Sequence, residues 1–195
     1  MTSSVSGSRR RVSARRAALA LCAWGLLYAA YRACYALGGT AGMFGVPRSP
    51  SQFRTVNGIA TGLLLLAAVL PLLLARGVRL RGAATVVGWV AGVGCCMHAL
   101  VDSILRVLSL TGVHPTRLPP DLWLSYDRHA SDLQDLLGNE PWFFVEGLLW
   151  AALALTMVRP ARRRTWIASA VVATLLLTTI GVLSGVGAIG SFIVA

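Results

Sequence analysis

The hydrophobic positions of the chain gather in five long blocks that are separated by shorter polar segments. Each block is close to the ~20 apolar residues that a helix needs to cross the hydrocarbon core of a bilayer. Within lipid, a helix satisfies its own backbone polar groups, so the pattern predicts an all-α polytopic transmembrane helical bundle. The five predicted spans cover residues 17–37, 57–75, 83–108, 141–158 and 166–186, within one transmembrane domain over residues 17–195.

The segment before the first block, residues 1–16, is rich in serine and arginine. It has too few apolar side chains to form a core, so we expect a disordered basic tail. A basic tail before an apolar run also occurs in signal peptides. Residues 17–37 are long enough to span, however, and no convincing cleavage site follows them, so we expect an uncleaved first span.

Residues 111–141 form the only sizeable polar segment between two blocks. Within it, Pro119-Pro120-Asp121 indicates a helix start and Gly138-Asn139 indicates a helix stop. Apolar residues recur between these signals at helical spacing, and acidic side chains occupy much of the remainder. The pattern predicts an amphipathic helix over about residues 120–137 that lies at the membrane interface. Its apolar positions are Leu122, Tyr126, Ala130, Leu133 and Leu137.

The composition supports a membrane protein and argues against a nucleic-acid partner. Of the 195 residues, 56% are hydrophobic and only 13% are charged, which is too apolar for a soluble domain of this size. The net charge of +11 would indicate nucleic-acid binding in a soluble protein. Here the arginines flank the apolar blocks, where topology and anionic lipid headgroups account for them better.

The distribution of the basic residues predicts how the chain crosses the membrane. All 18 basic residues are arginines. Twelve lie in the N-terminal tail and in segments 76–82 and 159–165, whereas four lie in segments 38–56 and 111–141. Cytoplasmic connections carry the excess of arginine in membrane proteins. We therefore expect a multi-pass protein of the cell membrane with its N-terminus in the cytoplasm and its C-terminus outside.

One face of the third block carries three ionisable residues, His98, Asp102 and Arg106, spaced four apart. On a helix they form a single polar stripe. A charged group at the bilayer centre costs roughly 2.5–3.5 kcal/mol on insertion scales, so the stripe should not face lipid. Arg32 and Glu146 lie at a similar depth, near the outer ends of their own spans. These five residues form the predicted binding site, a polar cluster in the outer leaflet.

Three interpretations of this predicted cluster remain open. The one we favour is a network of ion pairs that locks the first, third and fourth spans, with Arg32 paired to Glu146 or Asp102. The second is a polar cavity, open to the outside, that holds a lipid headgroup or a small polar ligand. In the third, the guanidinium of Arg32 reaches the headgroups without any partner.

The chain shows no pattern that specifies a reaction or a cofactor. His98 and Asp102 alone are too few for a zinc site, so we expect no metal and no cofactor. No Gly-x-Ser-x-Gly elbow, His-Glu-x-x-His helix or phosphate-binding loop is present, and we assign no catalytic residue. The four cysteines form no Cys-x-x-Cys pair and are expected to pack between helices.

Two pairs of glycines have the spacing of close helix contacts. Gly58 and Gly62 lie in the second block, and Gly88 and Gly92 lie in the third. Glycines four residues apart allow two membrane helices to approach closely. Such spacing is common in glycine-rich helices, so each pair is weak evidence for a particular interface.

Three separated strings of the chain resemble one group of proteins in the same order. The group consists of small multi-pass membrane proteins of high-GC bacteria that are classed together as a domain of unknown function. The resemblance covers about residues 17–158 and implies a membrane location and a helical bundle, but it implies no activity. The strings are Tyr35-Ala36-Leu37-Gly38-Gly39-Thr40, His98-Ala99-Leu100-Val101-Asp102 and Asn139-Glu140-Pro141-Trp142-Phe143-Phe144-Val145-Glu146-Gly147.

Two functional hypotheses follow from the sequence. The first is a non-enzymatic integral membrane protein whose polar cluster binds a lipid headgroup, a small ligand or a partner. The alternative is a membrane-embedded enzyme or carrier for a lipid-like substrate. In the alternative, Glu146 or Asp102 transfers a proton, and Arg32 or Arg106 holds an anion.

Overall fold

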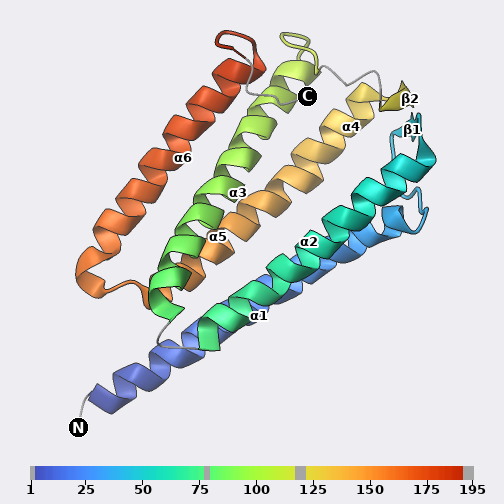
Figure 1. Cartoon of the computed structure of the whole chain (residues 1–195). Helices are drawn as coiled ribbons and strands as arrows, with labels where there is room; N and C mark the ends of the chain where they lie inside the picture. The colour runs from blue at the N-terminus through green and yellow to red at the C-terminus, as the bar shows by residue number, and fades with distance from the viewer. Residues whose placement is uncertain (1–2, 77–79, 117–121, 191–195) are drawn as a thin grey trace.

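The fold is a bundle of helices with one small two-stranded sheet at one end, seen in a computed structural model (Figure 1). The structure describes residues 3–76, 80–116 and 122–190. The helices are α1 (Ser3–Ala36), α2 (Pro50–Arg76), α3 (Arg81–Leu110), α4 (Arg128–Gln134), α5 (Glu140–Met157) and α6 (Arg163–Gly185), and the strands are β1 (Gly45–Pro47) and β2 (Trp123–Tyr126).

Four helical segments of the described chain are long and apolar enough to cross a membrane. They are Val12–Ala36 of α1, all of α2, all of α3, and Pro160–Gly185, which contains α6. The all-α class is therefore confirmed, and four of the five predicted spans coincide with helices of the length and composition that a span needs. The fifth predicted span, residues 141–158, coincides with α5. This helix is not one of the four, and it carries two glutamates within its 18 residues.

Helix α1 begins at Ser3, which differs from the disordered tail expected over residues 1–16. The difference has a simple physical cause. Adding residues to an existing helix is much easier than starting one, and arginine is a good helix former. The helical span can therefore propagate toward the N-terminus through the arginine-rich segment.

The predicted interfacial helix over residues 120–137 is wrong in its first half and in its end. Residues Trp123–Tyr126 form β2, which pairs antiparallel with β1. The ladder is extended by backbone hydrogen bonds from Arg48 to the Leu122 carbonyl and from Asp127 to the Phe44 carbonyl. These hydrogen bonds between the two segments satisfy backbone groups that a helical turn would otherwise have used. The predicted start at residues 120–121 lies outside the described residues.

The helical part of that segment continues directly into α5. Asp127 caps α4, because its carboxylate accepts a hydrogen bond from the Ala130 N–H at 3.0 Å. A π-turn over Asp135–Asn139 then connects α4 to Glu140, the first residue of α5. The expected stop at Gly138-Asn139 is therefore absent. The segment from Arg128 to Met157 is a single helical rod, which runs beside α3 (Figure 1).

Glycines allow a close contact between α3 and α5. A Cβ on Gly88 would lie 2.6 Å from the Ala154 Cβ, and one on Gly92 would lie 3.3 Å from the Gly147 carbonyl oxygen. The contact expected of Gly88 and Gly92 is thus confirmed. Gly62 has nothing within 4 Å of its Cβ position, so the expected role of the Gly58–Gly62 pair is not supported.

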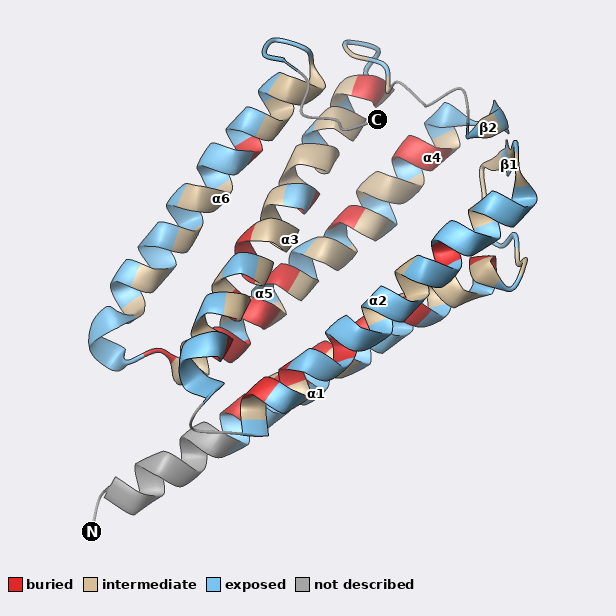
Figure 2. Ribbon diagram, in the orientation of Figure 1, coloured by how far each residue is buried: buried red, intermediate tan, exposed pale blue. Residues whose placement is uncertain are grey.

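The apolar core and the sheet lie at opposite ends of the bundle. The core gathers where α1, α2, α3 and α5 meet, near the start of α1 and the end of α2 (Figure 2). Helices α2 and α6 are largely exposed (Figure 2). Many of their exposed residues are leucine and valine, as expected of surfaces that contact lipid. The buried core residues are Ala14, Ala18, Leu21, Leu74, Ala84, Trp150 and Leu153.

Candidate functional site

The polar stripe of α3 faces the helical rod formed by α4, the π-turn and α5. His98 contacts Glu140 at the start of α5, and Arg106 contacts Asp132 in α4. The two elements run in opposite directions, so polar residues meet along the half of α3 that leads to the sheet. We call this set the polar column: His98, Asp102, Arg106, Ser109, Thr116, Asp132, Asp135 and Glu140.

Asp132 is the centre of the column at the end near the sheet. Its side chain is 2% exposed. It accepts hydrogen bonds from the Ser109 hydroxyl at 2.5 Å and from the Thr116 hydroxyl at 3.0 Å. It also accepts one from Nη1 of Arg106 at 3.2 Å. Buried carboxylates are stable only when paired and hydrogen-bonded in this way, so this end of the column is well satisfied.

Arg106 bridges two carboxylates of the facing rod. In addition to the contact with Asp132, its Nε lies 3.1 Å from Oδ2 of Asp135. Its Nη1 also donates to the Thr116 hydroxyl at 3.1 Å. A guanidinium offers five N–H donors in a fixed fork, and here three separate acceptors surround it. Arg106 thus has two carboxylates and one hydroxyl as neighbours within the protein, although its Nε forms no hydrogen bond with a described residue.

Hydrogen bonds from α1 fix the position of α4 at this end of the column. The side-chain amide of Gln134 donates to the hydroxyl of Tyr31 at 3.2 Å. The hydroxyls of Tyr31 and Tyr35 lie 2.7 Å apart, and Tyr35 donates to the Ala41 carbonyl at 2.9 Å. The chain of contacts therefore runs from the loop after α1 to the helix that carries Asp132.

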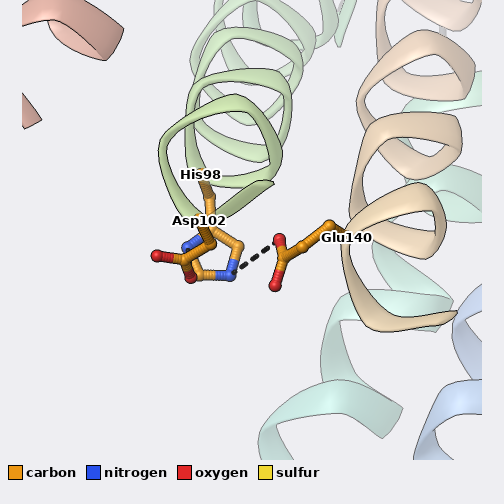
Figure 3. A group of neighbouring side chains, drawn as sticks. All are labelled: His98, Asp102 and Glu140. Atoms are coloured by element: carbon orange, nitrogen blue, oxygen red, sulfur yellow. Dashed lines mark ion pairs between the residues drawn. The ribbon is translucent and has the colours of Figure 1, made fainter. Parts of the chain in front are cut away.

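The end of the column farther from the sheet is a group of three side chains, His98, Asp102 and Glu140 (Figure 3). Nδ1 of His98 lies 3.5 Å from Oδ2 of Asp102, one turn along α3. Nε2 of His98 lies 3.9 Å from Oε2 of Glu140, to which it points across the helix interface (Figure 3). One potential ligand atom from each residue lies within 4.8 Å of the other two.

Glu140 is the least satisfied member of this group. The residue is 3% exposed, and within the described part of the chain its Oε2 has no hydrogen-bond donor. The contact with His98 at 3.9 Å is too long for a hydrogen bond. A buried carboxylate oxygen without a donor is costly, and a proton, a cation or a donor from outside the chain would each lower that cost.

The charge balance of the column is negative. It holds four carboxylates, Asp102, Asp132, Asp135 and Glu140, against the single guanidinium of Arg106. His98 adds a positive charge only when protonated. A site of this composition attracts cations and disfavours anions.

Two of the five predicted site residues lie outside the column. In the described ranges of the chain, no ion pair joins Arg32 to Glu146 or to Asp102. The electrostatic neighbours of Arg32 include Tyr28 and Tyr35 of its own helix. Glu146 interacts with the Trp150 side chain one turn along α5. The expected pairing of Arg32 is therefore not present, whereas His98, Asp102 and Arg106 do share one face.

The structure also adds residues that sequence reasoning did not assign to the site. By sequence, Asp132 and Asp135 are among the acidic side chains of the predicted interfacial helix, and Glu140 has no place in the predicted site. All three lie far from α3 in the sequence, so helical spacing could not associate them with His98 or Arg106. One signal in the sequence could have indicated these residues: the carboxylates are concentrated between residues 127 and 140, in a chain that has only seven acidic residues.

Comparisons with protein-family models, with curated proteins and with solved structures find no match to this chain.

Proposed function

We propose that this chain is a multi-pass protein of the cell membrane that binds a cation in the polar column and performs no covalent chemistry of its own. The fifth span in this proposal is the rod from Arg128 to Met157. This rod has as many residues as α3, which is 30 residues long, and packs along it. At about 1.5 Å per residue, each extends roughly 45 Å, enough to cross a bilayer.

The observation that carries this proposal is the buried carboxylate of Glu140, with an oxygen that no donor in the described chain satisfies. The cost of such a group is large in a membrane bundle, where water is scarce. A bound cation would remove most of that cost. The excess of carboxylates over guanidinium in the column supports the same charge class of ligand.

The engagement of Arg106 argues against an anionic headgroup as the ligand. The sequence-based hypothesis used Arg32 or Arg106 to hold an anion. Arg106 already contacts two carboxylates, and Arg32 forms no ion pair with any described residue. We do not extend the proposal to proton transfer by Glu146, because that residue contacts neither His98 nor Asp102 in the described part of the chain.

Binding can be tested on the full-length protein in lipid nanodiscs. Thermal unfolding is followed by tryptophan fluorescence in the presence of NaCl, choline chloride, MgCl2, CaCl2, MnCl2 or ZnCl2 at constant ionic strength. A ligand that binds only the folded state raises the unfolding temperature. We expect at least one of these cations to do so, and we expect Glu140→Gln to abolish the rise. Glu146→Gln changes a half-buried carboxylate of α5 that lies outside the column, and this variant should retain the rise in unfolding temperature.

Two outcomes would contradict the binding proposal. One is that none of the six salts raises the unfolding temperature above that of a control at the same ionic strength. The other is an equal rise in the wild type and in Glu140→Gln, which would place the cation elsewhere.

The proposed topology needs a separate test. The arginine distribution supports a topology with the sheet end of the bundle outside and the loop between α5 and α6 in the cytoplasm. Single cysteines at Val113 and at Arg164, in a background without the four native cysteines, report the two sides through a membrane-impermeant maleimide. In intact cells only the cysteine at position 113 should react. Labelling of both positions, or only of position 164, would overturn the topology.

A further inference from the structure

We propose that His98, Asp102 and Glu140 form a binding site for one divalent transition-metal ion, of the class of Zn²⁺ or Mn²⁺. The inference deepens the proposed function and rests on it, because it names the cation that the column would bind. It also changes the expectation from sequence, which found too few ligands for a metal. The third ligand, Glu140, comes from the facing helix (Figure 3).

The spacing of the three side chains is close to what a metal ion needs. Their potential ligand atoms lie within 4.8 Å of one another. Donor atoms bound to one Zn²⁺ at about 2.0–2.2 Å lie roughly 3.3–3.6 Å apart in a tetrahedral site. Rotation of side chains is enough to close the difference, since Asp102 is one turn from His98 on the same helix and Glu140 already points toward the imidazole (Figure 3).

The donor set favours a transition metal over the other cations. One imidazole nitrogen with two carboxylates suits zinc, manganese and iron, whereas Ca²⁺ takes six to eight oxygen ligands. Two carboxylates and one divalent ion are also electrically neutral together, which a monovalent cation would not achieve. Neutrality matters because the carboxylate of Glu140 is only 4% exposed.

The surroundings hold the imidazole in place and leave one side open. The ring of Phe143 meets the ring of His98 edge to face, with centroids 4.7 Å apart and an interplanar angle of 89°. The side chain of His98 is nevertheless 47% exposed. Three protein ligands with one accessible side would leave room for a water molecule or an outside group in the remaining positions.

The experiment measures metal binding directly on the full-length protein in nanodiscs. The protein is treated with EDTA, dialysed, and titrated with Zn²⁺ and with Mn²⁺ by calorimetry, and the bound metal is counted by inductively coupled plasma mass spectrometry. We expect one ion per chain. Loss of even an indirect ligand partner weakens metal binding by about 10–100-fold, so loss of a direct ligand should weaken it at least as much. His98→Gln, Asp102→Asn and Glu140→Gln should each show this loss.

Two control variants are matched to these changes. His129→Gln removes an exposed histidine of α4, and Glu146→Gln removes another carboxylate of α5. Both should bind metal as the wild type does. Co²⁺ provides a second measurement, for the case that a variant unfolds. The visible spectrum of Co²⁺ bound to the wild type should indicate nitrogen and oxygen ligands and a low coordination number. His98→Gln should change that spectrum and His129→Gln should not.

The possible results separate this inference from the proposed function. If Na⁺, choline, Mg²⁺ or Ca²⁺ stabilises the protein through Glu140 while Zn²⁺ and Mn²⁺ do not bind, the metal inference fails and cation binding stands. If no cation binds, both fail. Metal binding that survives in all three ligand variants would also overturn the site.

Discussion

The guanidinium of Arg106 and the carboxylate of Asp132 meet across the interface of α3 and α4, with Nη1 and Oδ1 3.2 Å apart. The carboxylate is 2% exposed and the guanidinium 20% exposed, so water screens the pair poorly. Ser109 and Thr116 donate to the same carboxylate. The pair is therefore part of a hydrogen-bonded network, in which removal of one member leaves several groups without a partner.

Asp132→Ala should destabilise the protein strongly. Breaking a buried ion pair on one side costs about 3–5 kcal/mol, and Asp135 would still hold part of the charge of Arg106, so we expect the lower end of that range. The free energy of unfolding can be measured by SDS titration in mixed micelles. A double-mutant cycle with Arg106→Ala should give strongly non-additive losses. Additive losses would show that the two side chains do not stabilise each other.

Gly88→Ala should destabilise the contact between α3 and α5. The new methyl group would meet the Ala154 Cβ at 2.6 Å and the Trp150 carbonyl oxygen at 3.0 Å, and overpacking of this kind costs about 1–3 kcal/mol. Gly62→Ala is the matched control, since nothing lies within 4 Å of its Cβ position. It should be neutral or stabilising by up to about 1 kcal/mol, from helix propensity alone. Equal effects in an unfolding titration would contradict the described packing.

Trp24→Phe should weaken the contact between α1 and α5. The indole rings of Trp24 and Trp142 stack with centroids 3.9 Å apart, and Trp24 Nε1 donates to the Trp142 carbonyl at 3.2 Å. Loss of the hydrogen bond and part of the stacking should cost about 1–2 kcal/mol. Trp142→Phe should cost less, because Nε1 of Trp142 is buried without an acceptor among the described residues. The opposite order of the two unfolding free energies would refute this account.

Asp127→Ala should loosen α4 without unfolding the bundle. The substitution removes the acceptor for the Ala130 N–H, and loss of an N-cap typically costs about 1 kcal/mol. Hydrogen–deuterium exchange should become faster over residues 128–134 and stay unchanged in α6. Asp127→Asn retains an acceptor and should behave as the wild type. Unchanged exchange in the alanine variant would mean that the cap contributes nothing to α4.

The helices were largely predictable because lipid imposes a length and a composition on any segment that crosses it. Helical spacing, by contrast, misassigned the segment around Tyr126. Its apolar residues have helical spacing, yet Trp123 and Tyr126 lie in a strand whose partner, β1, precedes α2 in the sequence. A pairing between such distant segments depends on how the helices bring their ends together, and local spacing does not contain that information.

The candidate site was predictable on one side only. Helical spacing placed His98, Asp102 and Arg106 on one face of α3. In the structure this face packs against the rod formed by α4 and α5. Spacing could not identify the facing groups, Asp132 and Glu140, because the sequence around them carries no sign that they contact α3. The same limit applies to the glycines: Gly88 and Gly62 belong to equivalent motifs, and only the packing shows which one meets a helix.

The π-turn over Asp135–Asn139 determines which carboxylates reach α3. Each residue of an α-helix rotates the chain by about 100°, so in an unbroken α-helix Asp132 and Glu140 would point about 80° apart. The π-turn takes up one extra residue and restores the alignment, so that Asp132 reaches Arg106 and Glu140 reaches His98. Deletion of Gly138 would leave Asp132 and Glu140 seven residues apart in a regular α-helix, about 20° from alignment, and should therefore keep the helical phase. The π-turn absorbs one surplus residue and therefore keeps the two ends of the polar column in phase.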